Sequence, residues 1–214
     1  MKSETLCEKG PGKQLLSKNE ERLHVVLFSL FYPAVLGTFF FTLFPEILRV
    51  ATSPWELSLW DYGKTGVAVL LVLHFDFDFV YTSEITKYNI KIFLSDLLVL
   101  VLFFVAYNAV HLGGKSEMDI TTIAGAMGAT YLLFRLWAYR VGGIVRDDRA
   151  LGRYEFGSTL WFVVVMILAM FTVTRLAAFW LLTIGLLVSA TAMWIIAPGT
   201  LQAFERERGA NSDE

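Results

Sequence analysis

Long apolar segments alternate with short polar ones over most of the 214-residue chain. A transmembrane helix needs about 20 mostly apolar residues, because the bilayer core is about 30 Å thick. Six segments approach or exceed this length, and little more than Arg175 separates the last two. They are 25–44, 66–83, 92–110, 120–139, 157–174 and 176–204. The pattern predicts an all-α polytopic membrane protein, a bundle of six transmembrane helices in which helices five and six form a tight hairpin.

The two ends of the chain are polar. Residues 1–23 mix lysines with glutamates, and they lack the short apolar core and small-residue cleavage site of a secretory signal. We therefore expect a cytoplasmic N-terminal arm at 1–23, a transmembrane domain at 24–200 and a polar cytoplasmic C-terminal tail at 201–214. The single cysteine, Cys7, excludes an intrachain disulfide.

Basic residues are distributed unevenly between the predicted helices. Of the 18 Lys and Arg residues, thirteen fall in the N-terminal arm, in 84–91, in 140–156 and in the C-terminal tail. Four fall in the alternate loops, and Arg135 lies inside a predicted helix. Because cytoplasmic loops are enriched in Lys and Arg, this asymmetry predicts a multi-pass protein of the cell membrane with both termini in the cytoplasm.

Composition agrees with the membrane interpretation. Hydrophobic residues make up 56% of the chain, which is more than an ordinary soluble domain contains. The formal net charge is only −2, so the chain offers no overall basic character that would favour nucleic acid. We expect the lipid bilayer as a partner and no nucleic acid.

The segment 66–83 is the least apolar of the six, because it contains His74, Asp76 and Asp78. The alternation FDFDF at 75–79 resembles a strand, but no other segment alternates in this way, so we favour a helix. In a helix, His74 and Asp78 share one face, and Asp76 points about 200° away from Asp78. The two aspartates are therefore not expected to share one tight site.

Two further charges lie inside predicted helices, Asp96 in the third and Arg135 in the fourth. At 1.5 Å per residue from the helix middle, Asp76 and Asp78 lie about 2 and 5 Å toward the cytoplasm. Asp96 and Arg135 lie about 7 Å toward the same side, and Tyr131 shares a helix face with Arg135. An unpaired charge near the bilayer centre costs about 3 kcal/mol, so these groups should face one another or water.

This polar layer has the chemistry of an ion path. One arginine can neutralise one carboxylate, which leaves two carboxylates to be protonated, hydrated or paired with a cation. A histidine one turn away can relay a proton. We therefore predict a small channel or secondary transporter that moves protons or a small cation and forms a homo-oligomer. Its transport-path candidates are His74, Asp76, Asp78, Asp96, Tyr131 and Arg135.

Catalytic and cofactor chemistry finds less support in the sequence. The pattern H-x-D-x-D offers one helical ligand pair, His74 and Asp78, which is too few for a zinc or iron site. No phosphate-binding glycine loop, nucleophile motif or paired-cysteine motif appears. We therefore favour a protein that is not an enzyme, and we expect no catalytic residues, no metal and no cofactor.

Two other interpretations stay open. The polar layer can be structural, because Asp96 and Arg135 lie near helix ends and can pair or extend to the surface. The protein would then be a membrane-disrupting or signalling component whose basic loop 140–156 and tails bind a cytoplasmic protein partner. A lipid-modifying intramembrane enzyme is the third class, and it would need acids that open sideways to lipid. Access of water to the aspartates distinguishes a transporter from a structural layer.

Overall fold

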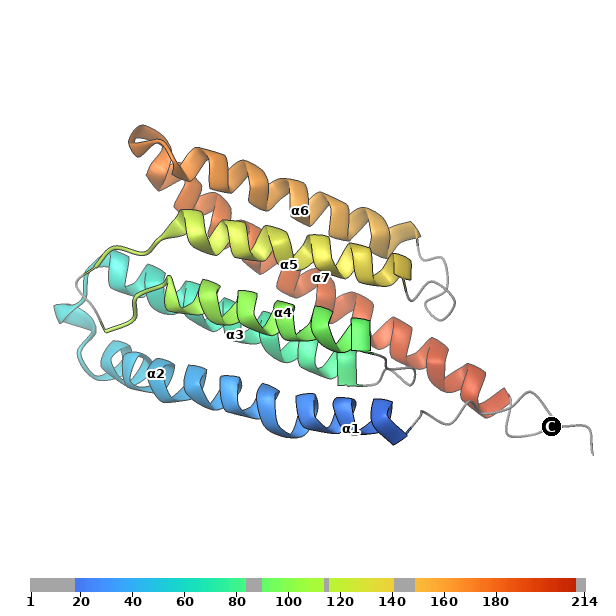
Figure 1. Cartoon of the computed structure of the whole chain (residues 1–214). Coiled ribbons are helices and arrows are strands. Elements are labelled where there is room, and N and C mark those ends of the chain that lie inside the picture. Colours follow the sequence, from blue (N-terminus) through green and yellow to red (C-terminus); the bar gives the residue numbers. More distant parts are fainter. Residues whose placement is uncertain (1–17, 84–89, 114–115, 141–148, 211–214) are drawn as a thin grey trace, which may run out of the picture.

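The computed structural model in Figure 1 describes residues 18–83, 90–113, 116–140 and 149–210, and these residues form helices and turns with no strand. The all-α prediction is therefore confirmed for this part of the chain. The FDFDF stretch lies inside α3 (Leu59–Ser83), so the alternation of Phe and Asp does not produce a strand. Its flanking residues extend the helix in both directions, which the strand alternative cannot accommodate.

The first helical rod has a break in its hydrogen-bond pattern before a proline. It consists of α1 (Lys18–Val26), a π-helical turn at Leu27–Phe31 and α2 (Tyr32–Thr52). Pro33, in the first turn of α2, has no N–H for the preceding turn, and a wider turn at this point accommodates the loss. The rod thereby brings Tyr32, the first residue of α2, into the interior.

The other helices follow in simple order. A short 3₁₀ turn (Pro54–Glu56) leads to α3, which is followed by α4 (Ile90–Asn108) and α5 (Ile120–Arg140). After α6 (Arg149–Ala169), a second 3₁₀ turn (Thr172–Thr174) leads to α7 (Arg175–Ala210). Helices α3 and α6 thus begin seven and eight residues before the segments predicted from hydropathy.

A local cap explains the early start of α3. The backbone N–H of Ser58 donates to Asp61 Oδ2 at 3.0 Å, and the N–H of Asp61 donates back to Ser58 Oγ at 3.2 Å. This reciprocal pair satisfies amide donors that a helix N-terminus leaves without partners. Polar residues therefore initiate the helix before its apolar part begins, and hydropathy alone places the start too late.

Within the part of the chain that the structure describes, three helices are long and apolar enough to cross a membrane, and they cover Arg22–Thr52, Ile90–Asn108 and Arg175–Met193. A shorter apolar helix covers Ile120–Phe134. These helices support a membrane protein. Crossing of the membrane by all six predicted segments stays a prediction, as does the hairpin of the last two.

The helices lie side by side along a common direction, as Figure 1 shows. The connections α2–α3, α4–α5 and α6–α7 lie at one end, and the start of α1 and the end of α7 lie at the other. Helix α5 packs against both α4 and α6, while α3 packs against α2 and α7. Gly128 of α5 faces α6, and a Cβ there would make an ordinary van der Waals contact with Phe162 Cβ at 3.5 Å.

A cluster of buried aromatic rings fills the middle of the bundle. Phe75 of α3 contacts Phe39 of α2 and Phe103 of α4, with ring centroids 5.2 and 5.5 Å apart. Phe39 also stacks on Tyr107 at 4.2 Å. Phe39 and Phe103 each lie about two helical turns from the polar residues at either end of their helices. This aromatic cluster (Phe39, Phe75, Phe103 and Tyr107) separates two groups of polar side chains.

Candidate functional site

The first polar group is centred on Asp78, which is only 2% exposed. Tyr32 of α2 donates its hydroxyl proton to Asp78 Oδ2 at 2.7 Å. The Tyr32 ring is held by stacking on Phe28 at 5.2 Å and by contacts with Phe75 and Phe79. A rigid aromatic donor therefore positions this carboxyl group inside the bundle.

Asp96 of α4 belongs to the same group. It is 4% exposed and lies close enough to Asp78 for an electrostatic interaction between the two carboxyl groups. The sequence placed the two aspartates at a similar depth on different helices and predicted that they face one another or water. Their proximity arises because α3 and α4 pack with these residues in the interior.

His74 lies one turn before Asp78 and is also buried. Its Nδ1 is 2.7 Å from the Leu70 carbonyl oxygen, and its Nε2 is 2.7 Å from Ser189 Oγ of α7. Ser189 Oγ is in turn 2.6 Å from the Gly185 carbonyl oxygen. These neighbours suit two protonation states of the ring.

The two states differ in where the Ser189 proton points. In a neutral ring, Nδ1–H donates to Leu70 and Nε2 accepts the proton of Ser189. In a charged ring, both nitrogens donate, and Ser189 accepts from Nε2 while donating to Gly185. A rotation of one hydroxyl group therefore satisfies the ring in either state.

Two tyrosines continue the polar group across α5 and α6. The hydroxyl of Tyr154 donates to the Ser189 carbonyl oxygen at 2.9 Å, and it lies 3.1 Å from the hydroxyl of Tyr131. Because Tyr154 donates its hydroxyl proton to Ser189, it accepts the hydrogen bond from the Tyr131 hydroxyl. We call the residues Tyr32, His74, Asp78, Asp96, Tyr131, Tyr154 and Ser189 the Asp78 group.

The structure brings together some of the predicted transport-path residues. His74, Asp78, Asp96 and Tyr131 are buried in the bundle, whereas Asp76 is exposed on another face of α3. Arg135 lies on α5, but its side chain is outside the described residues. The structure therefore does not place Asp76 with the other two aspartates.

Sequence reasoning missed Tyr32, Tyr154 and Ser189. Tyr32 carried a usable signal, because its hydroxyl lies beside Pro33 in a segment without charges. Ser189 is one of few polar residues in a segment without charges, and Tyr154 falls in a stretch that hydropathy assigned to a loop.

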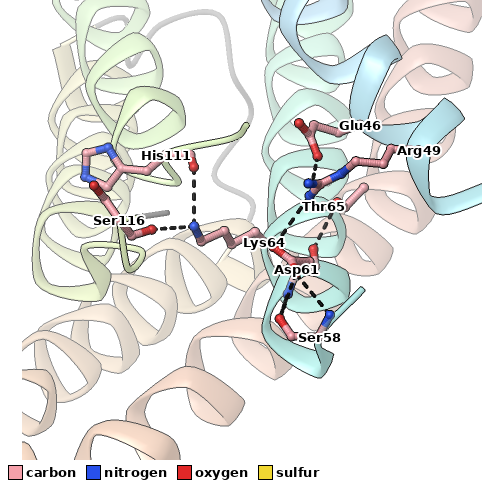
Figure 2. Close-up of polar contacts among 8 residues, drawn as sticks. All are labelled: Glu46, Arg49, Ser58, Asp61, Lys64, Thr65, His111 and Ser116. Atoms are coloured by element: carbon pink, nitrogen blue, oxygen red, sulfur yellow. Dashed lines mark hydrogen bonds and ion pairs between the residues drawn. The ribbon is translucent and has the colours of Figure 1, made fainter. Parts of the chain in front are cut away.

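A second polar group, shown in Figure 2, lies at the other end of α3. Arg49 Nη2 lies 2.9 Å from Glu46 Oε2 and 3.5 Å from Asp61 Oδ1. Lys64, which is 4% exposed, donates to the carbonyl oxygens of His111 and Ser116. The Lys64 group contains these six residues together with Ser58. Lys64 is one of the four basic residues predicted to lie in the alternate loops, but it lies within α3.

The carboxyl group of Asp61 is strongly hydrogen bonded. Ser58 Oγ donates to Asp61 Oδ2 at 2.7 Å, and the Ser58 N–H donates to the same atom. The Ser58 hydroxyl lowers the pKa of Asp61 below its ordinary value, and the backbone N–H and the positive charges of Arg49 and Lys64 act in the same direction. Asp61 is therefore a carboxylate that stabilises the start of α3.

Metal binding has no support among the residues that the structure describes, because no group of three or more His, Cys, Asp or Glu side chains there could hold an ion. Comparison of the chain with protein-family models, curated proteins and solved structures found no match. Function is therefore inferred from the residues of the two polar groups.

Proposed function

We propose that the protein is a six-helix integral membrane protein that binds and moves protons at the Asp78 group, as a small channel or secondary transporter. The observation that carries this proposal is the buried Asp78 carboxyl, bonded to the Tyr32 hydroxyl and within electrostatic reach of Asp96. Two buried carboxyl groups repel each other when both are charged, and burial adds a desolvation cost. A bound proton relieves both penalties.

The hydrogen bonds of His74 are compatible with the same function. Its neighbours satisfy the neutral and the charged ring, as the two arrangements of the Ser189 hydroxyl show. His74 and Asp78 are one turn apart on α3, so their side chains face the same region. A proton can thus be held at either of two neighbouring positions.

The proposed topology has both termini in the cytoplasm and places the Asp78 group nearer the cytoplasmic side. Three observations support it: three helices of membrane-spanning length, the uneven distribution of Lys and Arg, and the location of both ends of the described chain at one end of the bundle. In this topology α6 and α7 form the final hairpin, and the Lys64 group lies outside.

The aromatic cluster favours a transporter over an open channel. Phe39, Phe75 and Phe103 are each at most 2% exposed, and they lie between the Asp78 group and the Lys64 group. A continuous water path in this region requires these rings to move apart. Transport would therefore proceed in steps, with the aromatic cluster closed while a proton is bound at Asp78.

The test is proton flux into liposomes that contain the purified protein, driven by a pH gradient and read with an enclosed pH-sensitive dye. Replacing Asp78→Asn removes the titrating group and keeps a similar side chain, so we expect flux to fall at least tenfold, equivalent to about 1.4 kcal/mol in the barrier. Asp96→Asn tests the second carboxyl. Asp76→Asn is the matched control, because this exposed aspartate is only two residues away.

A second function has one specific observation in its favour. The packed aromatic cluster is also what a purely structural core would contain, and the protein would then be a signalling component that acts through cytoplasmic partners. Absence of flux in the parent under pH and potassium gradients would favour this alternative. So would equal flux in the parent and in Asp78→Asn.

A further inference from the structure

Three hydroxyl groups on three helices connect His74 of α3 with the outer part of α6. Ser189 Oγ of α7 lies 2.7 Å from His74 Nε2. The hydroxyl of Tyr131 on α5 lies 3.1 Å from that of Tyr154 on α6, and both tyrosine hydroxyls interact with the Ser189 side chain. We call Tyr131, Tyr154 and Ser189 the hydroxyl network. Each of its members can accept one hydrogen bond while it donates another.

The hydroxyl network is buried at one end and partly exposed at the other. Of the residues in the Asp78 group, all of which the structure describes, Tyr154 alone is not fully buried. It lies about 8 Å along α6 from the first residue of that helix, Arg149. Helix α6 begins at the end of the bundle where α1 also begins, as Figure 1 shows. Tyr154 is therefore the member of the group that surrounding water reaches most readily.

On the side of Asp78 that faces α2, aromatic rings take the place of hydroxyl groups. Phe28 and Phe79 pack on the Tyr32 ring, with centroids 5.2 Å away in both cases. Phe75 contacts the same ring at 5.1 Å. A phenyl ring neither donates nor accepts a proton, so these contacts offer no route for proton transfer. The hydroxyl network on the side of α5, α6 and α7 does offer one.

We propose that protons pass between cytoplasmic water and the Asp78 group through the hydroxyl network, with Tyr154 as the entry residue. This inference rests on the proposed function, because it names the route by which protons reach that site. For inward transfer, Tyr154 Oη accepts a proton from water and passes its own proton to Tyr131 Oη. Tyr131 passes its proton to Ser189 Oγ, which passes its own to His74 Nε2. Each oxygen forms one O–H bond and breaks one, so the added charge ends on the His74 ring.

Rotation of hydroxyl groups sets the direction of transfer. In the structure the Tyr154 hydroxyl donates to the Ser189 carbonyl oxygen at 2.9 Å and accepts from Tyr131, which suits outward transfer from Tyr131 to Tyr154. Turning the Tyr154 proton toward Tyr131, and the Tyr131 proton toward Ser189, gives the inward arrangement. These rotations move hydrogen atoms only, so the packed tyrosine rings stay in place.

The first test is proton flux into liposomes that contain the full-length parent or Tyr154→Phe, driven by a pH gradient. We expect flux to fall about tenfold or more in Tyr154→Phe, because the ring is kept and the entry hydroxyl is lost. Tyr62→Phe is the matched control. The Tyr62 hydroxyl also donates to a carbonyl oxygen at 2.9 Å, but it lies outside the Asp78 group, so its loss should leave flux unchanged.

A pH jump followed by infrared spectroscopy separates a residue on the route from a structural one. The signal is the band of the protonated Asp78 carboxyl group, identified as the band that Asp78→Asn lacks. After a jump to lower pH, the band in Tyr154→Phe should grow about tenfold more slowly than in the parent and reach the same final amplitude. A route changes the rate of protonation and leaves its equilibrium alone. A lower final amplitude reached at the parent's rate would overturn the proposal.

Ser189→Ala covers the case in which Tyr154→Phe does not fold. It removes Oγ from the network and keeps the backbone carbonyl oxygen to which Tyr154 donates, so flux should fall in the same way. If both variants kept the parent's flux while Asp78→Asn lost it, the proposed route would be wrong and the proposed function would stand. Absence of flux in the parent would overturn both.

Discussion

The Asp78 group and the Lys64 group lie at opposite ends of α3, and they bury polar side chains in different ways. In the Lys64 group, Glu46 and Asp61 pair with Arg49, and Lys64 meets carbonyl oxygens. In the Asp78 group, Asp78 meets a tyrosine hydroxyl and a second carboxyl group. Opposite charges fix one protonation state, whereas neutral hydroxyl groups are compatible with more than one.

This difference shows why burial alone does not identify a functional group. Lys64 and Asp78 are similarly buried, but the contacts of Lys64 hold a permanent positive charge in place. The contacts of Asp78 and His74 can rearrange when a proton arrives, through the hydroxyl groups of Tyr32 and Ser189. We therefore expect proton movement at the Asp78 group and a structural role for the Lys64 group.

The largest effect on the free energy of unfolding is expected at Phe75, which lies between the Asp78 group and the Lys64 group. Phe75→Ala removes a fully buried ring between Phe39 and Phe103, so it should lower the free energy of unfolding by about 3 to 5 kcal/mol. It should also raise proton flux through liposomes, because water can enter the space between the groups. Denaturant unfolding and the dye assay measure the two effects.

Phe41→Ala is the matched control for that change. Phe41 is 83% exposed on α2, so its loss should alter the free energy of unfolding by less than about 0.5 kcal/mol and leave flux unchanged. If Phe75→Ala increased the flux and Asp78→Asn did not reverse the increase, protons would be passing by a route that avoids the Asp78 group. The aromatic cluster would then not control proton movement through the Asp78 group.

The next effect concerns the hydroxyl group that contacts Asp78. Tyr32→Phe leaves a buried carboxyl without this donor and should lower the free energy of unfolding by about 1 to 2 kcal/mol. In an Asp78→Leu background the same change should cost much less, which a double-mutant cycle measures. Tyr62→Phe is the control, because the Tyr62 hydroxyl donates to the Pro54 carbonyl oxygen at the surface. Additive costs in the cycle would show that Tyr32 and Asp78 do not stabilise each other.

Helical spacing was enough to predict part of the Asp78 group. The 100° rotation per residue places Asp76 and Asp78 on different faces, and the structure shows one exposed and the other buried. It also places His74 on the Asp78 face. Such conclusions depend on one helix alone, so they do not require knowledge of how helices pack.

The partners of these residues depend on packing and were not predictable in the same way. Tyr32 is 46 residues from Asp78, and Ser189 is 115 residues from His74, so only the arrangement of α2, α3 and α7 brings them together. The partners of Lys64 were even less predictable, because they are backbone carbonyl oxygens, which every residue possesses. The early start of α3 did have a signal, the capping pair Ser58 and Asp61.

A smaller effect depends on pH and involves the cap of α3. The Ser58 hydroxyl is the main cause that lowers the pKa of Asp61 below its ordinary value in the folded protein. The contribution of Asp61 to stability is therefore present above the ordinary pKa and is lost as pH falls through the folded value. Ser58→Ala should lower the unfolding temperature at pH 7, and the difference from the parent should shrink as the pH approaches 3. Thermal unfolding across this range measures it. In an Asp61→Asn background the difference should not vary with pH, and variation there would assign the effect to another group.

The smallest effect is expected for the ion pair between Arg175 and Glu117, which lies at the same end of the bundle as the Lys64 group. Arg175 Nη1 and Glu117 Oε2 are 2.5 Å apart, but the two side chains are 41% and 65% exposed, so water and salt screen their attraction. Glu117→Gln should therefore change the free energy of unfolding by at most about 0.5 kcal/mol at low salt, and by nothing measurable at high salt. Denaturant unfolding at two salt concentrations is the measurement. A cost above that of Tyr32→Phe would reverse the ranking of the two groups, because an exposed ion pair would then stabilise the fold more than a buried hydrogen bond to a carboxyl group.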